Sequence, residues 1–253
     1  MIGIILKALC ALTYCVLLIS KAASFSAQQT VPFHQFSFAP NNVCIRPSSF
    51  YCQNDGKNGT QPNLEFTMRN VPGEGDCMFQ AVALAASTSL GLGGNNALLR
   101  AVARETREVV AQVLSAKGTL HIEGQRIVRA CDLLGSAAKN EQIKEEEYLQ
   151  LLRNGTLQGG GTELTVLSNV LRRPISIYEL VWDGVKLSVD VPEICAVSHM
   201  GSFGDIFLDP LLNIPDHAIL SGIQEGAYSW HIHILVVDGG GGEKHACVLL
   251  PKS

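Results

Sequence analysis

The sequence predicts an α+β fold in which a small, mostly antiparallel sheet packs against helices. Residues 77–171 carry apolar side chains at helical spacing, and residues 175–250 hold short runs of β-branched and other apolar residues. Helices that precede strands along a chain are typical of this class. The chain has 253 residues, of which 47% are hydrophobic and 17% are charged, so one domain with a sizeable core is expected.

Five segments are expected to be helical. The first is apolar nearly all round, which indicates a buried helix. The second repeats apolar residues every three or four positions and stops at Gly118, whereas Pro174 terminates the last because the residue before a proline avoids the helical region. The expected helices are 77–86, 98–117, 127–139, 145–153 and 163–171.

Five shorter segments are expected to be strands, namely 64–68, 175–180, 185–191, 231–237 and 245–250. The sequence DGGGGEK joins the last two as a hairpin connection. Residues 25 to about 70 are rich in Pro, Ser, Asn and Gln and are interpreted as a loose extension. Residues 192–228 show a mixed pattern that predicts no definite element.

The N-terminus has the features of a secretory signal peptide over residues 1–24. Its first nineteen residues are apolar apart from Lys7 and a few small polar groups, and Ala22 and Ser24 are small residues before a cut at Phe25. An uncleaved membrane anchor is the alternative, because the apolar run is long enough to span a bilayer. The small residues favour cleavage, so no stable membrane span is expected in the mature chain.

The stretch KAASFSAQ bears on the final compartment. It resembles the bipartite presequence of algae with complex plastids, in which a phenylalanine follows the signal cleavage site, as Phe25 does here. Residues 25–63 are interpreted as a low-complexity extension with the composition of a transit peptide. A plastid-associated compartment and the plain secretory route, to the outside or the ER lumen, both remain open.

Charge and cysteine spacing argue against a nucleic-acid binder, a disulfide-dense scaffold and a zinc-motif protein. A net charge of −4 argues against a nucleic-acid binder, because phosphate neutralisation needs a basic surface. Six of the eight cysteines follow the leader, and their spacing shows neither a dense disulfide framework nor a zinc motif. Cys44 and Cys52 flank a short polar loop and are the best candidates for a disulfide.

Cys77 stands where a glycine-rich turn, PGEGDC, leads into an apolar helix. At the first turn of a helix, unpaired N–H groups and the helix dipole favour a thiolate, which is the nucleophilic form of cysteine. Gly73 and Gly75 permit a tight backbone whose N–H groups point inward and can hold an oxyanion. The alternative is a structural cysteine buried after an ordinary turn.

Two motifs and a terminal histidine resemble one protein family. PGEGDCMFQAV is similar to the catalytic-cysteine box, G-D-G-x-C-L-F-R, of the ovarian tumour (OTU) family of papain-like cysteine proteases. The segment 145–180 is similar to the family's E-Y-L, W-G-G-x-x-E-L and P-I-x-V-Y motifs, although Gly160 stands near the tryptophan position. His245 follows the hairpin, where the family carries its catalytic histidine. The resemblance covers about residues 64–250.

This resemblance implies a papain-like OTU fold over residues 64–253, with a small sheet packed between helices. It also implies a thiol hydrolase, a deubiquitinase, that cleaves isopeptide bonds at the C-terminus of ubiquitin or a ubiquitin-like protein. Neither a metal nor an organic cofactor is implied. Ubiquitin or a ubiquitin-like protein is the expected partner, with no nucleic acid.

Residue by residue, the resemblance makes Cys77 the nucleophile and His245 the general base, and later the acid for the leaving amine. Glu74 occupies the position where the family usually has an aspartate. Backbone N–H groups of Gly75, Asp76 and Cys77 would form the oxyanion loop.

Three positions depart from the family pattern. Asp76 adds a negative charge directly before the nucleophile, which opposes thiolate formation unless it points away. Ala246 and Cys247 replace the aromatic residue and the Asn or Asp that orients the catalytic histidine. A third triad member must therefore come from elsewhere, with Glu74 as the first candidate and Asp238 as the second.

Two other interpretations remain. The altered positions are compatible with a catalytically impaired ubiquitin-binding module, and the secretory leader with a small globular protein in which Cys77 is paired in a disulfide. His231 and His233 alternate on one expected strand and so share a face. No third metal ligand is evident, and partly exposed strand histidines are expected.

Overall fold

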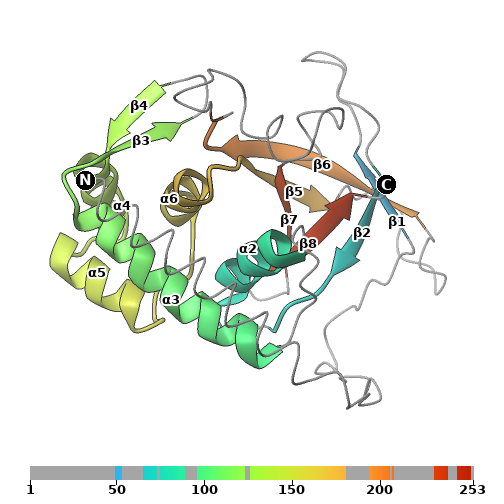
Figure 1. The fold of residues 1–253 in the computed structure, drawn as a ribbon, viewed down its shortest axis with the longest axis horizontal. Coiled ribbons are helices and arrows are strands. Elements are labelled where there is room, and N and C mark those ends of the chain that lie inside the picture. The colour runs from blue at the N-terminus through green and yellow to red at the C-terminus, as the bar shows by residue number, and fades with distance from the viewer. Residues whose placement is uncertain are drawn as a thin grey trace.

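The computed structural model describes residues 49–52, 65–72, 75–88, 96–122, 126–180, 194–205, 207, 231–238 and 244–251. Their elements are shown in Figure 1. The helices are α2 (Cys77–Thr88), α3 (Asn96–Ser115), α4 (Ala130–Asn140), α5 (Glu145–Arg153) and α6 (Gly161–Leu171). The strands are β1 (Ser49–Cys52), β2 (Glu65–Arg69), β3 (Thr119–Ile122), β4 (Arg126–Arg129), β5 (Ile175–Leu180), β6 (Ile194–Phe203), β7 (Ile232–Asp238) and β8 (Lys244–Pro251).

The main sheet closes on itself in the order β1-β2-β8-β7-β5-β6. Its pairs are antiparallel except β5 with β7 and β1 with β6, which are parallel. β3 and β4 form a separate antiparallel hairpin. The α+β class and the mostly antiparallel sheet predicted from the sequence are thereby confirmed.

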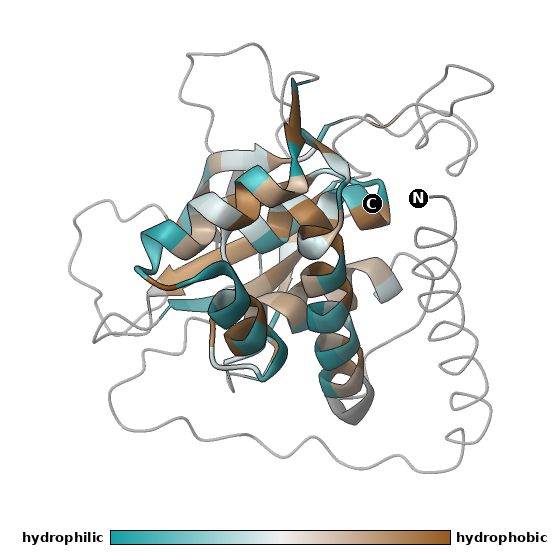
Figure 2. Cartoon of the chain, turned by 90° about the vertical axis from the view of Figure 1, so that its left-hand side faces the viewer, coloured by the Kyte–Doolittle hydropathy of each residue, from teal (hydrophilic) through white to brown (hydrophobic). Residues whose placement is uncertain are grey.

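The described helices gather on one side of this closed sheet (Figure 1). α2 lies against β7 and β8, and α3 packs across α2, α4, α5 and α6. A large apolar core fills the space between these helices and the sheet, and a smaller cluster around Phe66, Tyr178 and Leu235 lies among the strands. Figure 2 faces the helical side and shows helices with alternating hydrophilic and hydrophobic stripes, as helical periodicity requires.

Most predicted elements agree with the structure. The expected segments 145–153 and 175–180 coincide with α5 and β5, and the others that are described differ by a few residues at their ends. The prediction of a helix from 127 is wrong, because Ile127 and Val128 belong to β4 and the helix begins at Ala130. β-Branched side chains suit this short strand, which pairs with β3 through His121 opposite Ile127.

Besides β3 and β4, two further strands lie where the sequence predicted none. β1 falls in the segment interpreted as a loose extension, and β6 falls in the segment without a definite pattern. The leader, residues 25–48 and the expected strand 185–191 lie outside the described residues. Within the part of the chain that the structure describes, no helix has the length and hydropathy to cross a membrane.

Candidate active site

Cys77 is the first residue of α2 and is half-buried with a free thiol. The carbonyl of Asp76 accepts the first helical hydrogen bond, from the N–H of Gln80 at 2.9 Å. Gly75 has a φ of +78°, a backbone conformation that residues other than glycine rarely adopt. The chain therefore turns sharply before the cysteine and presents the N–H groups of the first helical turn at its end.

β8 supplies the histidine and packs against α2. His245 and Cys247 alternate on this strand and so lie on the same face of it. Cys247 is 3% exposed, and its burial, followed by the nearby charge of Cys77, raises the pKa of its thiol to about 12. Because α2 packs against β8, the helix that begins at Cys77 lies beside the strand that carries His245.

The partner of His245 is Asn70, the residue that follows β2. The Nε2 atom of His245 lies 2.7 Å from Oδ1 of Asn70. The same oxygen accepts a hydrogen bond from the N–H of Val71 at 3.0 Å and one from the thiol of Cys247 at 3.5 Å. Because an amide oxygen only accepts, Nε2 carries the proton in the neutral ring and Nδ1 is left as the basic nitrogen.

The imidazole of His245 is half-buried. Its burial lowers the pKa below the ordinary value of 6.5, and the carbonyl of Val71 acts in the opposite direction with a smaller effect. Burial disfavours the charged form of a base. The ring is therefore predominantly neutral near pH 7, which is the form that can accept a proton.

Arg107 of α3 holds the loop in front of the nucleophile. Its Nε donates to Oδ1 of Asp76 at 2.6 Å, and its Nη2 donates to the carbonyl of Gly75 at 3.3 Å. The Asp76 carboxylate thus has a positive partner, and its charge does not stand uncompensated beside Cys77. The negative charge of Asp76, which would otherwise oppose formation of the Cys77 thiolate, is therefore balanced by Arg107.

Buried polar contacts also hold the glycine-rich segment before α6. The hydroxyl of Tyr148 donates to Oε1 of Glu163 at 2.7 Å, and the N–H of Gly160 donates to Oε2 at 2.8 Å. Glu163 is 1% exposed, and together with burial its negative charge raises the pKa of the Tyr148 hydroxyl. A Cβ at Gly159 would overlap Cε of Met78, so this segment packs closely against the side chain of the residue that follows Cys77.

Comparison with known proteins identifies the family. A model of the OTU-like cysteine proteases matches residues 72–200, just over half of the 253 residues. The chain belongs to this family. The match contains Cys77, Arg107, Tyr148 and Glu163, whereas Asn70 and His245 lie beyond its two ends.

Solved OTU structures resemble the chain at low sequence identity. The viral OTU domain protease from Dera Ghazi Khan virus has 20% identity and a TM-score of 0.39, with 74% of this chain and 82% of the viral chain covered. The Hazara virus OTU, solved bound to ubiquitin, has 15% identity and a TM-score of 0.41, with 74% and 82% covered. The OTU domain of OTUD1 has 14% identity and a TM-score of 0.39, with 73% and 85% covered. No curated protein sequence matches the chain.

The structure describes some of the predicted site residues of this OTU domain and leaves others undescribed. It brings the elements of Cys77 and His245 together, and it describes Gly75 and Asp76 in the loop between β2 and α2. Glu74 and Gly73 lie outside the described residues, as does the side chain of Asp238. Neither candidate for the third triad member is therefore tested.

Sequence reasoning missed Asn70 and Arg107. Asn70 meets His245 across 175 positions of sequence, so no local pattern connects them. Arg107 is one of the charged residues between the apolar positions of the second expected helix and received no role from the sequence, yet it is 1% exposed. A signal existed, because Arg107 lies four residues after Ala103 and three before Val110, both of which are fully buried on α3.

The remaining histidines do not build a second site. His233 is 1% exposed and its Nδ1 lies 2.9 Å from the Tyr178 hydroxyl, so the expectation of a partly exposed histidine is wrong there. His231 is half-buried, with Nδ1 2.9 Å from Oγ of Ser176. Among the described residues, no group of three His, Cys, Asp or Glu could hold a metal ion.

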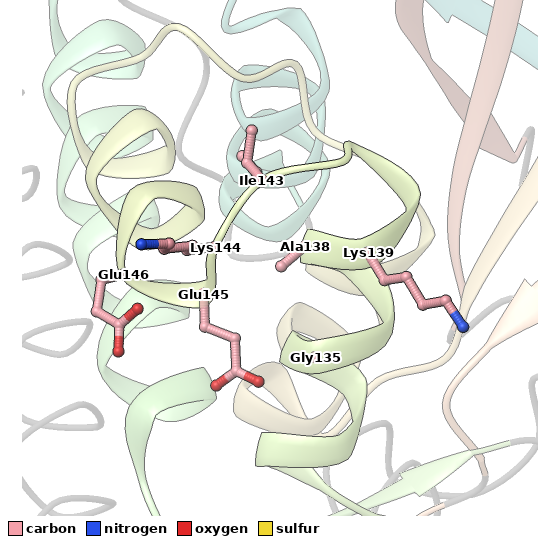
Figure 3. Close-up of a pocket in the computed structure, with 7 residues that line it drawn as sticks. All are labelled: Gly135, Ala138, Lys139, Ile143, Lys144, Glu145 and Glu146. Atoms are coloured by element: carbon pink, nitrogen blue, oxygen red, sulfur yellow. The ribbon is translucent and has the colours of Figure 1, made fainter.

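A shallow hollow of about 460 Å³ lies between the end of α4 and the start of α5 (Figure 3). Charged side chains line it, including Lys139, Lys144, Glu145 and Glu146. None of its lining residues comes from α2 or β8. The hollow therefore belongs to a different part of the molecule from the thiol and imidazole.

Proposed function

We propose that this OTU-family protein hydrolyses the isopeptide bond at the C-terminus of ubiquitin or a ubiquitin-like protein. Family membership supports a cysteine protease, and the resemblance of its motifs supports ubiquitin as the substrate class. The 2.7 Å contact between His245 Nε2 and Asn70 Oδ1 carries the proposal, because it leaves Nδ1 basic on the strand against which the Cys77 helix packs.

In this reaction, Nδ1 of His245 takes the proton of the Cys77 thiol and the sulfur attacks the substrate carbonyl carbon. N–H groups at the start of α2 stabilise the negative oxygen that forms. The imidazolium then gives its proton to the leaving lysine amine, and a thioester remains. Water, deprotonated by the same nitrogen, hydrolyses the thioester and restores the thiol.

The decisive experiment uses ubiquitin that carries a thiol-reactive group at its C-terminus. The purified chain is incubated with this probe beside Cys77→Ala, His245→Ala and Cys131→Ala, and mass spectrometry measures the covalent adduct. We expect an adduct that is lost in Cys77→Ala, formed slowly in His245→Ala and unchanged in Cys131→Ala, because Cys131 is an exposed thiol away from the site.

A catalytically impaired ubiquitin-binding module is the alternative. The observation that favours it is Cys247, which stands where the family places its orienting Asn or Asp. Binding of unmodified ubiquitin without any adduct would support this alternative. Absence of both, from a folded protein, would point to a different ubiquitin-like substrate, which the same probe chemistry on other modifiers identifies.

We also propose that residues 1–24 direct the chain into the secretory pathway and onward to a complex-plastid compartment. The composition of residues 25–63 and the position of Phe25 support this route. Fusion of residues 1–61 to a fluorescent protein tests it. Plastid-associated fluorescence is expected, and uniform secretion of the fusion would contradict the plastid destination.

A further inference from the structure

Arg107 is an unusual side chain for a helix of this kind, because it is charged and 1% exposed. Its burial is matched by partners. Four of the five N–H donors of a guanidinium are used by Asp76 Oδ1 and by the carbonyls of Gly75, Leu152 and Leu157. Its plane also lies over the ring of Phe79, 4.3 Å from the centroid.

Through these contacts, the Arg107 side chain connects three segments of the chain. Leu152 and Leu157 belong to the end of α5 and the segment after it, Gly75 and Asp76 form the turn before the nucleophile, and Phe79 is two residues beyond Cys77. A planar fork with bonds in several directions fixes the position of each segment, which a lysine with a single ammonium group does not reproduce.

The contact with the Gly75 carbonyl determines the direction of the next N–H. A trans peptide is planar, and its C=O and N–H point in opposite directions. Because the Gly75 carbonyl points at the buried guanidinium, the N–H of Asp76 points away from it. The next N–H along the chain, that of Cys77, has no partner within its own helix because it belongs to the first helical turn.

The ion pair with Asp76 serves the same loop. A free carboxylate next to the nucleophile would repel both a thiolate and an oxyanion. Arg107 compensates the charge of Asp76 without presenting its own positive charge to solvent.

We propose that Arg107 is a positioning residue that holds the Gly75–Asp76 peptide with its N–H directed at the acyl oxygen of the substrate. The inference rests on the proposed function for the identity of the substrate, whereas the position of the Gly75–Asp76 peptide does not depend on that function. Arg107 touches no reacting atom and acts through the loop. Its loss should slow reactions that develop an oxyanion, and spare reactions of the thiolate that do not.

Two reagents separate these reactions. Iodoacetamide alkylates the thiolate by displacement of iodide and forms no oxyanion, whereas p-nitrophenyl acetate acylates it through a tetrahedral oxyanion and releases p-nitrophenolate. The ratio of the two rates at Cys77, followed by mass spectrometry, is measured in the full chain. Turnover of a ubiquitin substrate gives kcat and KM alongside.

For Arg107→Lys we expect the acylation-to-alkylation ratio to fall about tenfold or more, the scale on which loss of an oxyanion donor acts. kcat should fall by a similar factor with KM nearly unchanged, because the loop acts on the transition state. Arg104→Lys, an exposed arginine on the same helix, is the matched control and should leave the ratio unchanged.

A second variant keeps the test valid if Arg107→Lys fails to fold. Gly75→Ala introduces a Cβ that meets nothing within 4 Å, yet the φ of +78° is unfavourable for alanine, so the same peptide should turn without a clash. It should lower the ratio in the same way.

Equal losses of acylation and alkylation that follow the loss of folded protein would overturn the proposal, as would an unchanged ratio in Gly75→Ala. Absence of ubiquitin turnover in the wild type with a lowered ratio in these variants would refute only the substrate.

Discussion

The Nε2 atom of His245 lies 2.7 Å from Oδ1 of Asn70, although 175 positions separate the two residues. The pairing of β2 with β8, which places Arg69 opposite Val248, brings them together. Asn70 thus directly follows the strand that pairs with the strand of the histidine, whereas the family motif places the orienting residue two positions after the histidine. Cys247 occupies that second position and donates to the same oxygen.

Replacement of Asn70 tests its orienting role. In Asn70→Ala the imidazole loses the amide oxygen that lies 2.7 Å from its Nε2, and we expect kcat to fall about tenfold or more because the general base is no longer held in place. Asn70→Asp retains an oxygen acceptor and should keep most of the activity. Steady-state kinetics with a ubiquitin substrate measure both.

Asn140→Ala at the exposed end of α4 is the control for a general effect of losing an asparagine. It should leave kcat unchanged. An Asn70→Ala protein that folds and turns over at the wild-type rate would show that His245 is oriented by another group.

Cys247 should resist alkylation while Cys77 and Cys131 react. Its thiol is buried with a pKa of about 12, so only about one molecule in ten thousand carries the thiolate at pH 8. Cys131 is exposed and Cys77 is half-buried. Iodoacetamide labelling of the native protein, followed by peptide mapping, measures the order of reaction. Rapid labelling of Cys247 in the native state would contradict its position in the sheet interior.

Gly159→Ala should destabilise the protein more than an ordinary surface substitution. The new Cβ would overlap Cε of Met78 and lie 3.0 Å from the Phe79 ring, so the Met78 side chain must move and the buried Phe79 ring must give way. Overpacking of this kind costs about 1–3 kcal/mol. Gly118→Ala is the matched control, because its Cβ meets nothing within 4 Å, and a change of about 0.5 kcal/mol or less is expected. Urea unfolding measures both, and equal values would contradict the close contact.

Local periodicity predicted the elements in which one pattern dominates. Residues 145–153 form α5 as expected, with three glutamates in the first turn and Tyr148 and Leu152 on the buried face. The hairpin of β3 and β4 was missed because tertiary contacts define it. Asn169 of α6 accepts from the N–H of His121 at 2.7 Å and donates to its carbonyl at 2.8 Å, and no local pattern near His121 shows this.

The candidate site divides in the same way. Cys77 and His245 were found from motifs, since the turn and the following helix or strand carry the pattern. Asn70 and Arg107 depend on how distant segments pack, and each resembles an ordinary residue in its own segment. Glu163 makes one contact of each kind, because it bonds the distant Tyr148 hydroxyl and also the N–H of Gly160 three residues before it.

The pH dependence of folding provides a test of the state of His245. Burial lowers its pKa below 6.5 in the folded protein, so the unfolded chain takes up this proton first as the pH falls. Stability is therefore lost from about pH 6.5 down to the folded pKa, below which both states are protonated and the loss is complete.

His245→Gln, which retains an N–H donor for Asn70, should lose less stability over this range than the wild type. Urea unfolding from about pH 7.5 to about pH 5 measures the difference. His121→Gln removes an exposed histidine and is the control for the loss of a histidine outside the site. A His245→Gln curve parallel to the wild type would show that the imidazole titrates alike in both states, and that burial does not hold it neutral.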